Sequence, residues 1–228
     1  MKTMMVMGVG LSLLLATCVW AADKPAAEEG FVSLFNGKNL DDWKVGANAK
    51  TFSVQDGMIV VHGRTAHLFY EGDVGHHSFK NFILKAEVMT FPRANSGIYF
   101  HTKFQQAGFP DYGIECQVDN SHSDPIRTGS LYGIKNIISR IPGGQPGSKI
   151  PVKDNAWYTQ EISCVDGHIV VHLDGKKVLE YQVPDSSQQH GFPHSKQIWL
   201  PRGTFALQGH DPGSKIYFKN IRVKILPD

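Results

Sequence analysis

Short segments that suit β-strands recur from about residue 31 to the end of the printed sequence. Residues 82–88, for example, alternate apolar and polar side chains in their second half, as a half-buried strand does. No long window has the period of an amphipathic helix. We therefore predict an all-β fold, a two-sheet antiparallel β-sandwich (jelly roll). The predicted strands are 31–35, 51–54, 58–62, 82–88, 97–102, 113–119, 130–134, 157–165, 168–173, 176–183, 203–208 and 215–225.

Turn residues between these segments predict how neighbouring strands are joined. Asp-Gly pairs stand between apolar runs at 56–57, 166–167 and 174–175. Asp-Gly in this setting is a strong signal for a two-residue β-hairpin. The longer segments 120–127, 139–155 and 184–202 are rich in Pro, Gly, Ser and His, and we expect them to supply walls of a binding site.

The N-terminal segment has the pattern of a signal peptide. Lys2 is followed by an almost unbroken apolar run over residues 4–16, and Ala21 offers a cleavage point. The run is too short to favour a membrane span. We expect residues 1–21 to be a signal peptide, 22–30 a flexible lead-in and 31–228 one domain of a periplasmic or secreted protein. Lipid attachment at Cys18 is the alternative.

Chain length, net charge and cysteine content limit the classes of function that this protein can have. A chain of 228 residues is long enough for one all-β domain with a proper core. The net charge is only +2 and no basic run or stripe appears, which gives no support for nucleic-acid binding. Beyond Cys18, Cys116 and Cys164 remain. They either form a disulfide or act as two small buried side chains, and no Cys-x-x-Cys spacing suggests a metal.

Polar side chains line one face of the predicted strand 113–119. Glu115, Gln117 and Asp119 alternate, so all three point to the same side. Such a row can hydrogen-bond a polyhydroxylated ligand or perform acid–base chemistry. The Cα atoms of Glu115 and Asp119 should lie about 13 Å apart, which is wide for the carboxyl pair of an ordinary glycosidase.

These polar residues belong to a set of short motifs that occur in the order of a known family. The chain resembles the 3-keto-disaccharide hydrolase domain family over about residues 31–226. The matching motifs are Leu34-Phe35-Asn36-Gly37-Lys38-Asn39-Leu40-x-x-Trp43, Phe52-x-Val54-x-Asp56-Gly57, Asn81-Phe82-Ile83-Leu84-x-x-Glu87, Asn95-Ser96-Gly97-Ile98-Tyr99-Phe100, Glu115-Cys116-Gln117-Val118-Asp119, Thr128-Gly129-x-Leu131-Tyr132, Leu207-Gln208-x-His210 and Ile216-x-Phe218-x-Asn220-Ile221.

The resemblance implies a sandwich of the concanavalin A-like lectin and glucanase type. It also implies cleavage of glycosides already oxidised to a ketone at C3 of the sugar, by elimination or hydrolysis, and hence an upstream sugar 3-oxidase. The ketone acidifies the C2–H bond. Cleavage by this route needs a base near C2, a hydrogen-bond donor or cation near the ketone oxygen, and an acid near the leaving oxygen.

Candidate roles follow from residue chemistry. We assign Glu115 as the general base, and His210 as the acid or the group that polarises the ketone. Gln117 and Gln208 are expected to bind substrate hydroxyls. The opposing interpretation of each residue is a structural contact on a sheet face or loop.

Four further residues are candidate substrate contacts. Asn95 either lines the site or fixes a turn, and Asp119 either binds a hydroxyl or caps a turn. His101 should share a face with Tyr99, although relatives often carry Arg at this position. Tyr132 either stacks on a sugar ring or packs on the sheet.

A metal and a non-enzymatic function both remain open. A divalent metal held by His101, Glu115 and His210 requires the fold to bring them together, so no metal ligand is assigned. No nucleotide-binding motif and no nucleophile elbow is present. The leading function is an exported enzyme that cleaves 3-keto glycosides. Its rivals are a non-catalytic carbohydrate-binding sandwich and, more weakly, an adhesion module.

Overall fold

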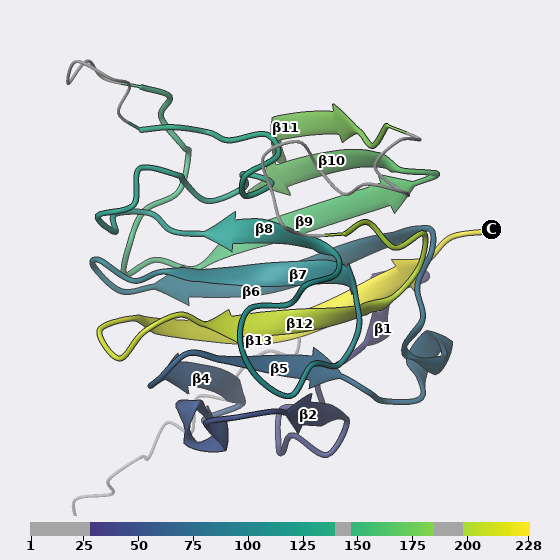
Figure 1. Ribbon diagram of the computed structural model, residues 1–228, viewed down its shortest axis with the longest axis horizontal. Coiled ribbons are helices and arrows are strands. Elements are labelled where there is room, and N and C mark those ends of the chain that lie inside the picture. Colours follow the sequence, from purple (N-terminus) through teal and green to yellow (C-terminus); the bar gives the residue numbers. More distant parts are fainter. Residues whose placement is uncertain (1–27, 140–146, 185–197) are drawn as a thin grey trace, which may run out of the picture.

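Two antiparallel sheets stack face to face in the computed structural model, which describes residues 28–139, 147–184 and 198–228 (Figure 1). One sheet has the order β11-β10-β9-β6-β13-β4-β3, with β1 paired to β13, and the other has the order β2-β5-β12-β7-β8. The predicted β-sandwich is confirmed. The strands of the eight-stranded sheet are β1 (Val32–Ser33), β3 (Phe52–Gln55), β4 (Met58–His62), β6 (Phe82–Thr90), β9 (Tyr158–Val165), β10 (His168–Leu173), β11 (Lys176–Gln182) and β13 (Lys215–Ile225). Those of the five-stranded sheet are β2 (Trp43–Val45), β5 (Ala66–Tyr70), β7 (Ser96–Thr102), β8 (Ile114–Val118) and β12 (Thr204–Gly209), and two 3-10 turns are η1 (Ala49–Thr51) and η2 (Val74–His77).

The Asp-Gly turns join strands as predicted. Asp56, Asp166 and Asp174 each have a φ of 48°, and the glycine after each also has a positive φ. Positive φ at both central residues is the type I′ geometry, whose twist matches that of the flanking strands. These turns therefore fix the β3–β4, β9–β10 and β10–β11 hairpins.

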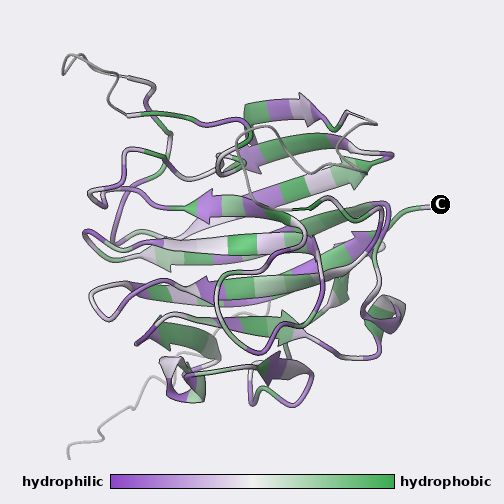
Figure 2. Cartoon of the chain, in the orientation of Figure 1, coloured by the Kyte–Doolittle hydropathy of each residue, from purple (hydrophilic) through white to green (hydrophobic). Residues whose placement is uncertain are grey.

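The hydrophobic core lies between the two sheets. Alternate residues of β6 are buried, among them Phe82, Leu84 and Val88, while those between them are partly exposed. The same alternation of apolar and polar residues is visible along other strands (Figure 2). The strands β7, β8 and β12 differ, because they are buried on both faces.

One predicted strand is wrong, and two observed strands were not predicted. Residues 130–134 form no strand; Leu131 makes only isolated bridges to Cys116 and Lys135. The backbone bends there because Gly129 and Gly133 both have positive φ. The short strands β2 and β5 were not predicted, since neither has a clear alternation or an Asp-Gly turn beside it.

Other expectations concern the N-terminal region and the cysteines. The expected signal peptide lies outside the described residues, and within them no helix is long and apolar enough to cross a membrane. Glu28, expected in a flexible lead-in, forms ion pairs with Lys85 and Arg222.

Cys116 and Cys164 are both free and buried, so the alternative without a disulfide holds.

Candidate functional site

A row of polar side chains crosses the outer face of the five-stranded sheet, the face that points away from the core. On this face His67 of β5 lies opposite Gln208 of β12, and Tyr99 of β7 lies opposite Glu115 of β8. The loop between β7 and β8 passes over this face (Figure 1), and its Phe104 packs on Phe69 of β5. This covering explains why the strands beneath are buried on both sides.

Glu115 is the buried carboxyl at the centre of this row. Only 6% of the residue is exposed. Its Oε2 accepts a hydrogen bond from the Tyr99 hydroxyl at 2.9 Å, and its Oε1 accepts one from the Gln208 amide at 2.8 Å. Burial raises the pKa of Glu115 to about 7, although these two hydrogen bonds act in the opposite direction. A carboxyl with this pKa can exchange a proton near neutral pH.

Gly97 makes room for this carboxyl. A Cβ atom placed on Gly97 would lie 2.3 Å from Glu115 Oε1 and 2.7 Å from its Cγ. Its φ does not lie in the left-handed region, so the constraint is steric rather than conformational. Glu115 therefore lies across the neighbouring strand, over Gly97 and towards Gln208.

Two buried amides continue the row. With its nitrogen facing Glu115, the Gln117 amide donates to Glu115 Oε1 at 3.1 Å and to the Ser96 carbonyl at 3.3 Å. Asn95, only 2% exposed, faces the other side of Gln117, and its Nδ2 lies 3.4 Å from His122 Nδ1. The structure thus brings Asn95, Gln117 and Gln208 together around Glu115.

His210 lies at the rim of the same site. Its Nδ1 is 2.9 Å from Asp211 Oδ2, and its ring centroid is 5.7 Å from that of His122 and 6.0 Å from that of Phe109. Partial burial acts to raise the pKa of Asp211, but hydrogen bonds from Ser214, His210 and a backbone N–H together lower it below its ordinary value. A carboxylate that orients a histidine in this way is a recurrent feature of acid–base sites.

Tyr132 stands at the edge of β8. Its backbone N–H donates to the Glu115 carbonyl at 3.0 Å, and its hydroxyl donates to Asp124 at 3.0 Å. The residue is 36% exposed, so its ring can present a face to a ligand. Asp124 belongs to the segment 120–127, which supplies part of the rim.

Asp119 has a different environment from Glu115. Its Oδ1 accepts hydrogen bonds from the Arg127 guanidinium and the His122 backbone N–H, both at 2.8 Å. Burial raises its pKa to about 6, opposed by the His122 hydrogen bond and by Arg127. Of the two roles left open by the sequence, these contacts correspond to the turn-capping one.

The placement of His101 is corrected by the structure. His101 has a φ of 51°, at a point where the pairing of β12 with β7 changes register. This bulge turns the ring away from the face that carries Tyr99, because one extra residue reverses the alternation. The ring instead lies 4.5 Å from Trp199, centroid to centroid, and its Nε2 is 2.9 Å from the Lys80 carbonyl oxygen.

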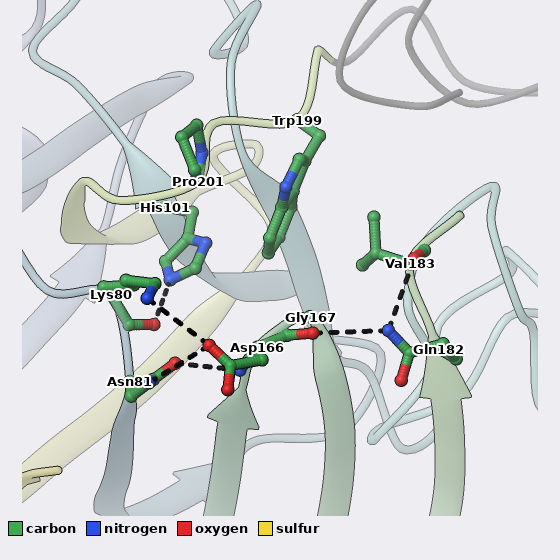
Figure 3. A pocket seen from close by; sticks show the side chains of 9 residues that line it. All are labelled: Lys80, Asn81, His101, Asp166, Gly167, Gln182, Val183, Trp199 and Pro201. Carbon is green, nitrogen blue, oxygen red and sulfur yellow. Dashed lines mark hydrogen bonds and ion pairs between the residues drawn. The ribbon is translucent and has the colours of Figure 1, made fainter. Parts of the chain in front are cut away.

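Figure 3 shows His101 in a separate pocket of about 190 Å³, whose other walls include Lys80, Asp166 and Trp199. Lys80 and Asp166 form an ion pair there at 3.4 Å. None of the Glu115 neighbours named above lines this pocket. The triad of His101, Glu115 and His210 considered for a metal is not assembled, and the described part of the chain contains no group of three or more His, Cys, Asp or Glu positioned to hold one.

His67 is the site residue that the sequence analysis missed. It is only 4% exposed, and its Nε2 has no hydrogen-bond partner among the described residues. Burial lowers its pKa to about 4, so the ring is neutral at pH 7. The available signal was a single histidine inside the apolar run 66–70, which forms β5.

The architecture and this buried polar row define a β-sandwich of the lectin and glucanase type. The family model of the 3-keto-alpha-glucoside-1,2-lyase-like domain matches residues 30–224, and the chain belongs to this family. It is 25% identical over 241 residues to the 3-keto-disaccharide hydrolase of Bacteroides thetaiotaomicron, an alignment that covers 89% of this chain and 80% of that protein.

Solved structures show the same fold. A candidate glycosyl hydrolase of Parabacteroides distasonis superposes with a TM-score of 0.66 at 24% identity, covering 87% of this chain and 95% of that one. A Bacillus subtilis protein with a galectin-like fold superposes with a TM-score of 0.60 at 13% identity, covering 86% and 94%.

Proposed function

We propose that this protein is an exported enzyme that cleaves 3-keto glycosides, with Glu115 as the base that removes the C2 proton. The observation that carries the proposal is the buried Glu115 carboxyl, whose pKa is raised to about 7 by burial. An efficient general base has a pKa near the operating pH. Family membership and the name of the Bacteroides thetaiotaomicron relative support the substrate class.

The reaction follows from where electrons can move. The Glu115 carboxylate takes the C2 proton, and the C2–H electron pair forms an enolate with the C3 ketone. The enolate then re-forms the ketone and expels the oxygen at C1, which leaves a C1–C2 double bond. Addition of water to that double bond gives the free 3-keto sugar, so elimination and net hydrolysis share the first step.

His210 is the acid for the departing oxygen. Asp211 holds its Nδ1 side at 2.9 Å, which leaves the opposite ring nitrogen to face a ligand. His210 lies beside Phe109 and His122, and we expect the aglycone to lie at this rim. Asn95, Gln117 and Gln208 supply hydrogen bonds to hydroxyl groups, and Tyr132 supplies an aromatic face.

An ordinary glycosidase mechanism fits this geometry less well. It needs two carboxyl groups flanking the glycosidic bond. Asp119 is the other carboxyl that the strand pattern offers, and Arg127 and the backbone of His122 already bind it. A mechanism with one carboxyl base and a ketone-activated C2–H bond needs no second carboxyl.

The rival function is a non-catalytic sugar-binding sandwich. The same amides and Tyr132 serve that role, but sugar binding gives no reason to bury a carboxyl without a cation. Among the described ion pairs, none involves Glu115. This difference favours the enzyme.

The first experiment incubates the purified protein with a 3-keto disaccharide and with its unoxidised parent, and follows products by mass spectrometry. We expect cleavage of the keto sugar alone. Cleavage of neither sugar, together with saturable sugar binding, would establish the rival. A parallel reaction with chelator tests for a divalent metal.

Two parts of the proposal concern the cell. The signal-peptide pattern of the first 21 residues supports a periplasmic or secreted location, with lipid attachment at Cys18 as the alternative. The substrate carries a ketone, so a sugar 3-oxidase acts before this protein. Fractionation with and without residues 1–21 tests the location.

A further inference from the structure

We infer that His67 donates the hydrogen bond that polarises the substrate ketone, and so stabilises the enolate that forms when Glu115 removes the C2 proton. This assignment rests on the proposed function and deepens it. In it, His67 donates a hydrogen bond to the ketone oxygen, and His210 protonates the departing oxygen.

The position of His67 relative to Glu115 supports this role. Gln208 pairs with His67 across the β5–β12 ladder and donates to Glu115 Oε1 at 2.8 Å. The His67 and Tyr99 rings are 5.2 Å apart, and the Tyr99 hydroxyl binds the other Glu115 oxygen. His67 and the Glu115 carboxyl therefore stand on either side of Gln208, where a carbonyl oxygen and its neighbouring C–H can face one group each.

Unpartnered polar atoms at this place indicate a ligand. Buried polar atoms almost always have a hydrogen-bond partner, because burial of an unpaired one destabilises the fold. His67 Nε2 and Gln208 Oε1 both lack one among the described residues. They belong to cross-strand neighbours. A substrate ketone oxygen would accept from His67 Nε2, and a neighbouring substrate hydroxyl would donate to Gln208 Oε1.

The charge state of His67 suits a ketone. A neutral imidazole carries one N–H, and this role requires the proton on Nε2, the nitrogen without a partner among the described residues. A carboxylate base combined with a neutral imidazole is a known solution for removing a proton next to a carbonyl. Burial keeps His67 neutral, with a pKa of about 4, and the nearby Gly108 backbone, which acts the other way, does not reverse this.

Phe109 packs edge-on against this imidazole. Its ring centroid lies 5.7 Å from that of His67, and 49% of the residue is exposed. An exposed aromatic side chain on a loop can rotate more easily than a core side chain. In this proposal, rotation of Phe109 would open space for the substrate ring beside His67.

The test compares His67→Phe, which keeps a ring but removes the hydrogen bond, with His67→Gln, which restores a donor. His101→Phe is the matched control, because His101 is equally buried and has a similar pKa but lies in the other pocket. We expect kcat for the 3-keto disaccharide to fall about 10²–10³-fold in His67→Phe, while KM rises by no more than about tenfold. His67→Gln should recover part of the loss, and His101→Phe should keep kcat.

A binding measurement separates this inference from the proposed function. Calorimetry on Glu115→Gln protein, in which turnover is expected to be about 10³-fold slower, compares the 3-keto disaccharide with its parent. One hydrogen bond to the ketone should favour the keto sugar by about tenfold, and His67→Phe added to this background should remove the preference.

The outcomes distinguish failure of the His67 role from failure of the proposed enzyme activity. A wild type that cleaves keto sugars, with His67→Phe no slower than His101→Phe, overturns the role of His67 and leaves the proposed function standing. A wild type that cleaves nothing, with a keto preference lost in His67→Phe, overturns the enzyme and keeps His67 as the ketone contact. The inference is also overturned if the Glu115→Gln protein, with His67 intact, binds the keto sugar and its parent with equal affinity.

Discussion

Glu115 and Asp119 lie four residues apart, at the start and just past the end of one strand, yet their surroundings differ in kind. Asp119 is bound by the Arg127 guanidinium and by a backbone N–H of its own turn. Glu115 is bound only by neutral groups, the Tyr99 hydroxyl and the amides of Gln208 and Gln117. A carboxyl with a cationic partner stabilises a loop, whereas a buried carboxyl without one is poised to accept a proton.

The largest expected effect is the loss of activity in Glu115→Gln. An amide keeps the shape of the side chain but cannot accept the C2 proton. We expect kcat for a 3-keto disaccharide to fall about 10³-fold, measured by product formation under saturating substrate. Glu161→Gln, on the partly exposed outer face of the eight-stranded sheet, is the control and should remain active. A Glu115→Gln protein within tenfold of wild type would show that Glu115 is not the base.

Asp119→Ala should lower the stability of the fold and leave the activity almost unchanged. It leaves the Arg127 charge, whose side chain is 11% exposed, without its partner. Removal of one partner of a buried pair costs about 3–5 kcal/mol, so the free energy of unfolding in urea should fall by that amount. The protein that remains folded at low temperature should keep kcat within a few-fold of wild type. Normal stability with lost activity would place Asp119 in the reaction.

Glu115→Gln should also stabilise the protein at high pH. The folded-state pKa of Glu115 is raised from 4.5 to about 7, so the folded state binds this proton more tightly than the unfolded state. That contribution is fully present below pH 4.5 and is lost as the pH rises through 7. At pH 8 the amide variant should be more stable than wild type by up to about 3 kcal/mol, and the two should converge near pH 4. Urea unfolding at both pH values measures this; a variant less stable at pH 8 contradicts it.

Gly97→Ala tests the position of the carboxyl rather than its charge. The new methyl group would overlap Glu115 Oε1, so the side chain must move. A displacement of about 1 Å can cost up to about 10²-fold in kcat, and we expect a loss of at least tenfold with KM little changed. In the Glu115→Ala background the same change should have almost no effect on stability, since the overlapping atoms are gone. A fully active Gly97→Ala enzyme would show that the Glu115 position is not critical.

Local signals in the sequence predicted much of the fold. The hairpins at Asp56, Asp166 and Asp174 were recognised because a type I′ turn is set by its own two residues. The strands β2 and β5 were not, because they are short and are defined by pairing with strands far away in the chain.

The candidate site was predicted in part for the same reason. Glu115 and Gln117 share a strand, so the side-chain period of two placed them together. His101 was misplaced because a bulge cannot be seen in the apolar pattern. His67 was missed because its nearness to Glu115 depends on β12 and β7 lying between β5 and β8, an arrangement that no local pattern reveals.

The most direct test of the account follows the C2 hydrogen of a 3-keto disaccharide during cleavage in heavy water. At early times, before unreacted substrate exchanges, mass spectrometry of the product should show either the C1–C2 elimination product or a 3-keto sugar with deuterium from the solvent at C2. Both should form about 10³-fold more slowly with Glu115→Gln. A hydrolysed 3-keto sugar that retains its original C2 hydrogen would contradict proton abstraction by Glu115.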